Sequence, residues 1–346
     1  MKNGLLQVVV AGVPHGCQDV QKNGHWLTRS RIDAIRSVSD SVNVVETSEQ
    51  ELAAGQLPTQ RAEVLLTETS GTMPELDGSI PGQITAGLFK KLIHDELRWV
   101  QSCSAGVEHL VHAFPKSVII SNAAGNHSRA LAETAIAAIL SHVKRFRERF
   151  HRQRRHVWEE LHCRELKGST LCVVGTGNIG GAVAELAAPL GMELIGVRRT
   201  PRPTPNFRRV VGPAELNNVL AGADFVVIAC PLTPETIGMV GARELARMKA
   251  GAYLINMSRG KVIDEQALVA SLQRGRIGGA FLDAFGQEPL PENNPLWDLP
   301  GVTIIPHDSH SSQLIGDNMV ALFCENLRRY IVGEPLRNVV DRARGY

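Results

Sequence analysis

Three charged residues in the last third of the chain are of types that suit hydride-transfer chemistry. Each follows a predicted strand: Arg259 in LINMSRG, Glu288 in FLDAFGQEPLP and His307 in IIPH. In an open α/β sheet the ligand crevice lies at the carboxyl ends of the strands, so reactive groups are expected there. Reduction of a keto acid needs a hydride source, a proton donor for the carbonyl oxygen and a cation that polarises that oxygen. A histidine with a carboxylate partner and an arginine can supply the donor and the cation.

A glycine-rich turn earlier in the chain indicates where the hydride carrier binds. The apolar run Leu171–Val174 leads directly into GTGNIG, which has GxGxxG spacing and precedes a helical pattern. The first glycine makes the tight turn, the second lets the pyrophosphate approach the backbone, and the third lets helix and strand pack closely. The helix N-terminus offers N–H groups to the phosphates. The predicted cofactor-binding residues of the turn are Gly175, Thr176, Gly177, Asn178, Ile179 and Gly180.

The residues after the next predicted strand bear on which nicotinamide cofactor is preferred. An NAD-preferring site places a carboxylate about 20 residues past the glycines. This chain has Arg198 and Arg199 at that place, with no acid nearby. Guanidinium groups bind a 2′-phosphate through paired, charge-assisted hydrogen bonds. We therefore expect NADP(H) to be preferred and NAD(H) to be possible; in the alternative, one arginine stacks on adenine and both cofactors are accepted.

The elements that must position these groups alternate between strand and helix along the whole chain, which predicts α/β architecture with parallel sheets. A Gly- and Pro-free stretch, Ser128–Phe150, predicts one long helix. Apolar spacing from Ile315 to Ile331 predicts a last helix that Gly333 ends. The predicted strands are Leu5–Ala11, Ser41–Glu46, Glu63–Thr67, Arg98–Gln101, Ser117–Ser121, Leu171–Val174, Glu193–Arg198, Asp224–Cys230, Ala252–Asn256, Gly278–Asp283 and Val302–Pro306.

Composition excludes several classes of protein. At 346 residues the chain predicts two domains. A formal net charge of +2 and 5% aromatic residues argue against nucleic-acid and membrane partners. Six scattered cysteines without CxxC spacing argue against a disulfide framework or a metal site. The arginine-rich stretch 144–156 is expected to be the solvated end of the long helix, partly paired by Glu148, Glu159 and Glu160. With Leu5–Val13 interpreted as a strand rather than a signal peptide, we expect a cytoplasmic protein.

Several separate motifs make the chain similar to the D-isomer-specific 2-hydroxyacid dehydrogenases over nearly its whole length. They are QSCSAGVEH, NAAGNHSRALAE, GTGNIGG, PLTPET, SRGKVIDE, LDAF, EPLP and PH. The resemblance implies two Rossmann-like, doubly wound parallel-sheet domains. One is a split substrate domain, residues 1–121 plus 311–346, and the other is an inserted NAD(P)-binding domain, residues 122–310. It also implies a homodimer built on cofactor-domain surfaces.

The resemblance also implies roles for individual residues. Arg259 bridges the substrate's carbonyl oxygen and carboxylate, and protonated His307 donates its proton as hydride arrives. Glu288 accepts the other imidazole N–H and favours the charged ring. The remaining roles are substrate-carboxylate binding by the backbone of Ala105, Gly106 and Val107, nicotinamide binding by Asp283, and cofactor-groove lining by Cys230 and Pro231.

The expected reaction is hydride transfer between NADP(H) and the C2 position of a small 2-hydroxy or 2-keto acid. One departure concerns specificity: the family usually has a glycine shortly after Pro-His, whereas this chain continues Asp308-Ser-His-Ser-Ser312. We expect a serine or aspartate there to cap the last helix, or else to contact a further anionic group of the substrate. Loop Thr69–Met73 is expected to border the pocket. Two alternatives stay open, a dehydrogenase of the same fold acting on another small anion such as a phosphonate, and a nucleotide-sensing, corepressor-like binding protein.

Overall fold

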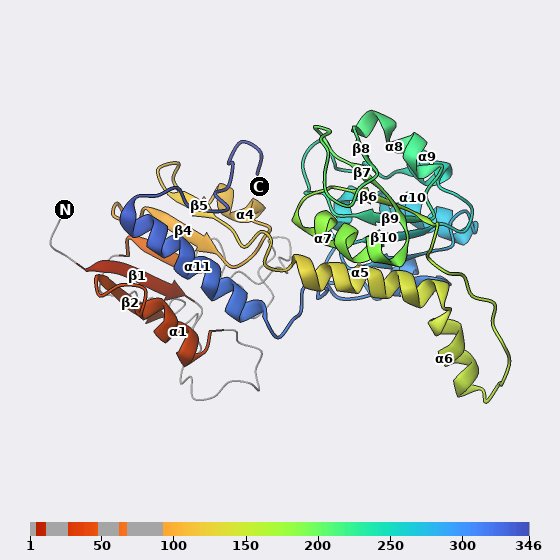
Figure 1. Ribbon diagram of the computed structural model, residues 1–346, viewed down its shortest axis with the longest axis horizontal. Helices are drawn as coiled ribbons and strands as arrows, with labels where there is room; N and C mark the ends of the chain where they lie inside the picture. Colours follow the sequence, from red (N-terminus) through yellow and green to blue (C-terminus); the bar gives the residue numbers. More distant parts are fainter. Residues whose placement is uncertain (1–4, 12–26, 48–61, 68–92, 346) are drawn as a thin grey trace. The chain divides into compact units, whose positions relative to one another are not determined.

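The computed structural model describes residues 5–11, 27–47, 62–67 and 93–345. Loop Thr69–Met73, expected at the pocket, lies outside these residues. The chain divides into two compact units. We call residues 128–311 the inserted unit, and residues 1–127 with 312–346 the split unit. Each unit contains its own parallel β-sheet with helices around it (Figure 1).

The inserted unit is built on a seven-stranded sheet in the order β12-β11-β10-β9-β6-β7-β8. All its neighbouring strands pair in parallel. The chain enters at β6, runs outward to β8, and then crosses to β9 and outward to β12, so the winding direction reverses between β6 and β9. The strands are β6 (Thr170–Val174), β7 (Glu193–Val197), β8 (Arg209–Val211), β9 (Phe225–Ile228), β10 (Tyr253–Asn256), β11 (Gly279–Leu282) and β12 (Val302–Ile304).

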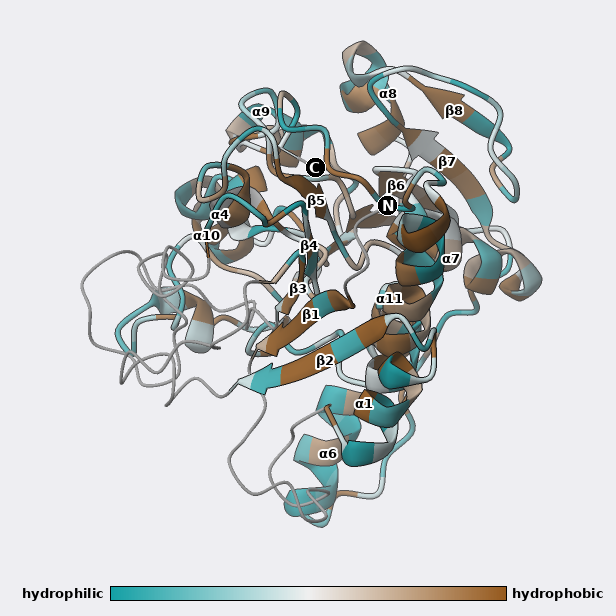
Figure 2. Cartoon of the chain, turned by 90° about the vertical axis from the view of Figure 1, so that its left-hand side faces the viewer, coloured by the Kyte–Doolittle hydropathy of each residue, from teal (hydrophilic) through white to brown (hydrophobic). Residues whose placement is uncertain are grey.

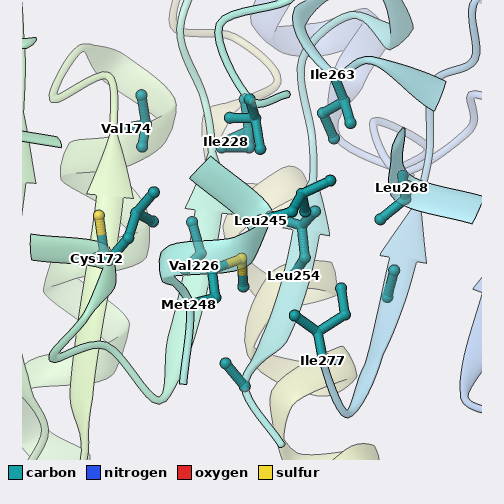
Figure 3. Close-up of a cluster of buried hydrophobic side chains, with 14 of the residues drawn as sticks. Cys172, Val174, Val226, Ile228, Leu245, Met248, Leu254, Ile263, Leu268 and Ile277 are labelled. Carbon is teal, nitrogen blue, oxygen red and sulfur yellow. The ribbon is translucent and has the colours of Figure 1, made fainter. Parts of the chain in front are cut away.

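The central strands of this sheet are apolar at nearly every position, as suits strands covered on both faces. Successive side chains point to opposite faces, so alternate residues enter different cores. Figure 3 shows one core, into which β6 directs Cys172 and Val174 and β9 directs Val226 and Ile228. On the other face α5 (Ser128–Val143) and α7 (Asn178–Ala187) pack in a second core. The first core is covered by α8 (Leu216–Leu220), α9 (Ala242–Arg247) and α10 (Glu265–Gln273).

The long helix expected over 128–150 is in fact two helices. Arg145 has φ 55°, a left-handed conformation that ends α5 and turns the chain into α6 (Phe146–Arg154). No side chain of α6 is buried, and Arg152 pairs with Glu148 at 3.0 Å and with Glu159 at 3.1 Å, as the solvated interpretation of this stretch predicts. Sequence patterns also missed β8, a three-residue edge strand. The helical segment after the glycine-rich turn ends in the 3₁₀ turn Ala188–Leu190.

The split unit has five parallel strands in the order β2-β1-β3-β4-β5. The last helix, α11 (Ile315–Val332), buries Val320, Phe323 and Leu327 in the same core as strand residues from the first third of the chain. In Figure 2, β2 alternates apolar and polar colours, as suits a strand at the sheet edge. The other elements are β1 (Leu6–Ala11), β2 (Val42–Thr47), β3 (Val64–Thr67), β4 (Trp99–Ser102), β5 (Ile119–Ser121), α1 (Arg29–Arg36) and α4 (Glu108–Val111).

Within the part of the chain that the structure describes, no helix combines the length and apolar character needed to cross a membrane. The same residues contain no group of three or more His, Cys, Asp or Glu side chains arranged to hold a metal ion.

Candidate active site

The predicted site residues of the inserted unit all follow the carboxyl ends of its parallel strands. Arg259 follows β10, Asp283 and Glu288 follow β11, and His307 follows β12. These three strands are neighbours in the sheet, and parallel pairing puts their carboxyl ends at one edge. Residues that are far apart in sequence therefore share one border of the sheet.

His307 and Glu288 form a direct pair. The imidazole Nδ1 lies 2.9 Å from Oε2 of Glu288, and each side chain is 19% exposed. The other carboxylate oxygen of Glu288 accepts the backbone N–H of Phe285 at 2.9 Å. His307 itself has φ 53°, a left-handed conformation that is uncommon for a non-glycine residue. Because Nδ1 is engaged by the carboxylate, Nε2 is the nitrogen that the pair leaves for proton exchange.

Burial and charge act in opposite directions on Glu288. Burial by itself raises the pKa of Glu288, but hydrogen bonds from His307 and from the Phe285 N–H lower it, as do the charges of His307 and Arg259. The net effect is a lowered pKa, so Glu288 is a carboxylate at neutral pH. A carboxylate in this position stabilises the imidazolium form of its partner and fixes which nitrogen carries the exchangeable proton.

The turn that carries Arg259 packs against the turn that carries Glu288. A Cβ built on Gly260 would lie 1.9 Å from the carbonyl carbon of Phe285, so only glycine allows this approach. The Asn256 side-chain amide stabilises the turn by donating to the Arg259 carbonyl oxygen at 3.2 Å. The guanidinium donates to the Ser258 carbonyl oxygen at 3.1 Å and is half-buried. The structure therefore places the turn of Arg259 beside the Glu288–His307 pair.

Asp283 lies at the end of β11 and is 2% exposed. Its Oδ1 accepts the backbone N–H of Ser309 at 3.1 Å. Burial raises the pKa of Asp283, against the lowering effects of the Ser309 hydrogen bonds and of the charges on His307 and His310. The carboxylate is thus anchored by one oxygen next to the histidine loop.

The expectation that a serine or aspartate of the 308–312 loop caps the last helix is wrong. The N-cap residue of α11 is Leu314, which has no side-chain capping hydrogen bond. Ser309 is instead buried in the inserted unit, with its N–H on Asp283 and its hydroxyl toward the sulfur of Met257 at 4.0 Å. The Ser312 hydroxyl accepts the N–H of Leu314 at 3.2 Å and so forms a turn just before the helix.

The glycine-rich turn has the geometry that dinucleotide binding requires. Gly175 has φ 99°, and a Cβ there would lie 2.5 Å from the Ala229 carbonyl oxygen. A Cβ on Gly180 would lie 1.9 Å from the carbonyl oxygen of Gly175. Around Gly177, by contrast, a Cβ would meet no described atom within 4 Å, so protein packing does not require this glycine. Open space at this N-cap fits a phosphate approaching the first turn of α7, where exposed Asn178 and half-buried Ile179 follow.

Cys230 and Pro231 lie next to this turn, at the end of β9. A Cβ on Gly175 would also crowd the Cys230 nitrogen, at 2.6 Å. Burial raises the pKa of the Cys230 thiol to about 11, so the thiol is neutral and unreactive at physiological pH. The carbonyl oxygen of Pro231 accepts the Thr236 hydroxyl at 2.8 Å, which shapes the PLTPET loop.

The two arginines after β7 have different surroundings. Arg198 is half-buried and donates from Nη1 to the Thr176 hydroxyl oxygen at 3.3 Å, whereas Arg199 is exposed. A carboxylate from another loop is electrostatically coupled to Arg199. The Thr233 hydroxyl is the main cause of the lowered pKa of Glu235, and the charge of Arg199 contributes to it. Glu235 belongs to the loop after β9, so counting residues from the glycines could not find it.

The predicted carboxylate-binding backbone lies in the split unit, after β4. Ala105 is exposed, Gly106 is half-buried and Val107 is buried. The N–H groups of these three residues donate no hydrogen bond to another residue within the described ranges. The carbonyl oxygen of Ala105 accepts the Asn122 side-chain amide at 3.0 Å, and Oδ1 of Asn122 accepts the Ala124 N–H at 3.1 Å. Sequence reasoning did not assign Asn122 a role, although its position directly after β5 was a signal.

A seven-stranded doubly wound sheet with a GxGxxG turn at its switch point, and with Arg, Glu and His at the same edge, defines a nicotinamide dinucleotide-dependent oxidoreductase. The comparison with family models agrees. Residues 136–309 match the model described as "D-isomer specific 2-hydroxyacid dehydrogenase, NAD binding domain". The chain belongs to the D-isomer specific 2-hydroxyacid dehydrogenase family and is an NAD(P)-dependent enzyme acting on CH–OH donors.

Similar proteins include glyoxylate reductase of Korarchaeum cryptofilum, 33% identical over 260 residues, which are 71% of this chain and 77% of that relative. Glyoxylate/hydroxypyruvate reductase B of Yersinia enterocolitica is 36% identical over 217 residues, 61% of this chain and 67% of that relative. Among solved structures, a family protein from Aeromonas salmonicida has 28% identity and a TM-score of 0.81, with 97% of this chain and 99% of that chain covered. A family enzyme from Xanthobacter autotrophicus in complex with NADPH and MES has 29% identity and a TM-score of 0.79, with 98% and 99% covered.

Proposed function

We propose that this protein is an NADP(H)-preferring reductase of a small 2-keto acid, with Arg259, Glu288 and His307 as its catalytic residues. The observation that carries the proposal is the 2.9 Å pair between His307 and Glu288, next to the turn of Arg259. Relatives named glyoxylate reductase and glyoxylate/hydroxypyruvate reductase make glyoxylate and hydroxypyruvate the first substrates to test.

The proposed division of labour follows from the chemistry of these side chains. When bound, NADPH supplies the hydride. In its protonated form, His307, whose Nδ1 is paired with Glu288, donates a proton from Nε2 to the substrate's carbonyl oxygen. In the oxidative direction the same nitrogen takes the proton back. Arg259 contributes positive charge where negative charge develops on that oxygen, and holds the substrate carboxylate.

Binding roles outside this trio are part of the same proposal. The N–H groups of Ala105, Gly106 and Val107 bind the substrate carboxylate, which is consistent with their lack of partners among the described residues. The second oxygen of Asp283 accepts the amide of the nicotinamide while Ser309 holds the first. Cys230 and Pro231 line the cofactor groove beside the glycine-rich turn.

The cofactor preference rests on Arg198 and Arg199, which lie after β7 where an NAD-preferring site has an acid. Exposed Glu235 near Arg199 is a counter-charge that a 2′-phosphate has to compete with. We therefore expect a preference for NADP(H) with NAD(H) still accepted. Similar structures in complex with NADPH, and with NADP at 25% identity, are consistent with this expectation.

The proposed domain roles follow from the same assignments. The split unit is the substrate domain and the inserted unit the NAD(P)-binding domain, and the family-model match at 136–309 lies within the latter. We also propose a homodimer built on surfaces of the inserted unit. This unit exposes Phe146, Phe150 and fully exposed Trp158 in and after α6. The mass measured by light scattering checks this, and a monomer at micromolar concentration would contradict it.

The deciding experiment measures oxidation of NADPH and NADH against a panel of 2-keto acids. We expect the highest kcat/KM for a small 2-keto acid with NADPH. A clear preference for NADH would contradict the cofactor assignment. Turnover of a phosphonate but of no keto acid would replace the substrate class, and binding of nucleotide with no turnover at all would favour a corepressor-like binding protein.

A further inference from the structure

Arg198 is held in place by a residue of the glycine-rich turn. Its Nη1 donates to Oγ1 of Thr176 at 3.3 Å. Thr176 follows β6 and Arg198 follows β7, and these strands pair so that Val174 lies opposite Val197. The hydrogen bond thus joins the turn that approaches the cofactor's pyrophosphate to a side chain that we propose binds its 2′-phosphate.

Thr176 is itself firmly positioned. It is 7% exposed, and its methyl group occupies the space that a side chain at position 196 would need. A Cβ built on Gly196 would lie 2.4 Å from Cγ2 of Thr176. Because a β-branched side chain has few allowed χ1 rotamers, seating the methyl group over Gly196 also fixes the direction of the hydroxyl.

In the hydrogen bond between Arg198 and Thr176, only the arginine can be the donor. A guanidinium has five N–H donors and no acceptor, so the threonine oxygen must be the acceptor. Only Nη1 of Arg198 is used in this bond, which leaves further donors of the fork for an anion. A long arginine side chain that is ordered before the ligand arrives loses less conformational freedom on binding. A valine at position 176 would have a similar shape but would offer Arg198 no acceptor.

We propose that Thr176 is a positioning residue for cofactor selection, whose hydroxyl holds Arg198 in the orientation that receives the 2′-phosphate of NADP(H). The inference rests on the NADP(H) preference proposed above and adds a residue that decides its strength. It also explains why a hydroxyl is useful between the first two glycines, where the GxGxxG pattern itself allows any residue.

The test compares Thr176→Val with Thr176→Ser as the matched control that keeps the acceptor. Calorimetry measures binding of adenosine 2′,5′-bisphosphate and of 5′-AMP, which differ by the 2′-phosphate, and kinetics measure KM for NADPH and NADH. We expect Thr176→Val to weaken binding of the bisphosphate about tenfold, as for loss of one hydrogen bond to a charged group, with no comparable change for 5′-AMP or NADH. Thr176→Ser should keep the wild-type preference.

A general folding or binding defect in Thr176→Val would weaken binding of both adenosine nucleotides, not of the bisphosphate alone. If Thr176→Val weakens both adenosine nucleotides equally, or keeps the full wild-type preference, Thr176 does not position Arg198 for selection. Arg198→Ala separates this from failure of the NADP(H) assignment. If Arg198→Ala abolishes a preference that Thr176→Val retains, only the role of Thr176 falls. If the wild-type protein binds the two nucleotides equally, both proposals fall together.

Discussion

Gly260 and Phe285 belong to different turns, yet a Cβ built on the glycine would lie 1.9 Å from the carbonyl carbon of the phenylalanine. One of these turns carries Arg259. The other carries Glu288, whose Oε1 accepts the Phe285 N–H at 2.9 Å. The close backbone approach therefore sets the distance between the proposed catalytic cation and the carboxylate that holds His307.

Gly260→Ala should separate the two turns, because the added methyl group meets backbone and not a movable side chain. We expect a loss of about 1–3 kcal/mol in the free energy of unfolding and at least a tenfold loss of kcat/KM. Gly222→Ala is the matched control, since its Cβ would meet Val219 at an ordinary 3.7 Å. Urea unfolding and steady-state kinetics measure both effects, and a fully active Gly260→Ala would refute the role of the contact.

Glu288→Gln should change the pH dependence of turnover. The glutamine keeps an acceptor for the Phe285 N–H but removes the negative charge 2.9 Å from His307, which makes the protonated ring less stable. We expect the pH profile of kcat/KM to change, because the variant lacks the carboxylate beside the proposed proton donor. An unchanged profile would contradict the pairing as a catalytic feature.

The lowered pKa of Glu288 also predicts a pH dependence of stability. The Glu288 carboxylate binds a proton less tightly in the folded protein than in the unfolded chain, where its pKa has the ordinary value of 4.5. The stabilisation is thus complete well above pH 4.5 and is lost as the pH falls through the lower folded value. Glu288→Gln lacks this component, so its unfolding free energy should fall less than that of the wild type over the same acid range. If urea titrations show that the wild type and Glu288→Gln lose the same unfolding free energy over this acid range, the prediction is contradicted.

Arg259→Ala and His307→Ala should each impair chemistry far more than cofactor binding. We expect kcat/KM to fall by about 10²- to 10⁴-fold, while NADPH still binds in a fluorescence titration. Exposed Arg274, at the end of α10, and exposed His151, in α6, provide matched alanine controls. Near-normal turnover in either site variant would remove that residue from the mechanism.

Asn122→Ala should affect the keto acid more than the cofactor. The amide of Asn122 holds the Ala105 carbonyl oxygen, and the same peptide plane carries the Gly106 N–H in the opposite direction. Without it we expect KM for the keto acid to rise about tenfold, with a smaller change in KM for NADPH. Asn122→Asp, which keeps the acceptor for the Ala124 N–H but not the donor, should behave like alanine. Equal increases in both KM values would indicate a general structural defect.

Much of the fold could be predicted from periodicity and glycine placement. Strands buried on both faces are recognisable by their runs of apolar residues, as in FVVI of β9. The GxGxxG turn is recognisable because a side chain at Gly175 or Gly180 would collide with backbone, while the space around Gly177 is open. The break at Arg145 could not be predicted. Nothing in its residue type requires a left-handed conformation, which the chain adopts where α5 stops packing on the sheet and α6 becomes solvated.

The sequence by itself determined the class of the protein, because parallel strands bring their carboxyl ends to one edge and thereby assemble Arg259, Glu288 and His307. Only the tertiary structure decided which residues lie beside the predicted cofactor-binding side chains. The charge of Glu235 couples to that of Arg199, Thr176 accepts a hydrogen bond from Arg198, and the Ser309 N–H donates to Asp283, each between separate loops. Such contacts depend on side-chain directions and on backbone approach at places such as Gly196, and spacing along the chain specifies neither.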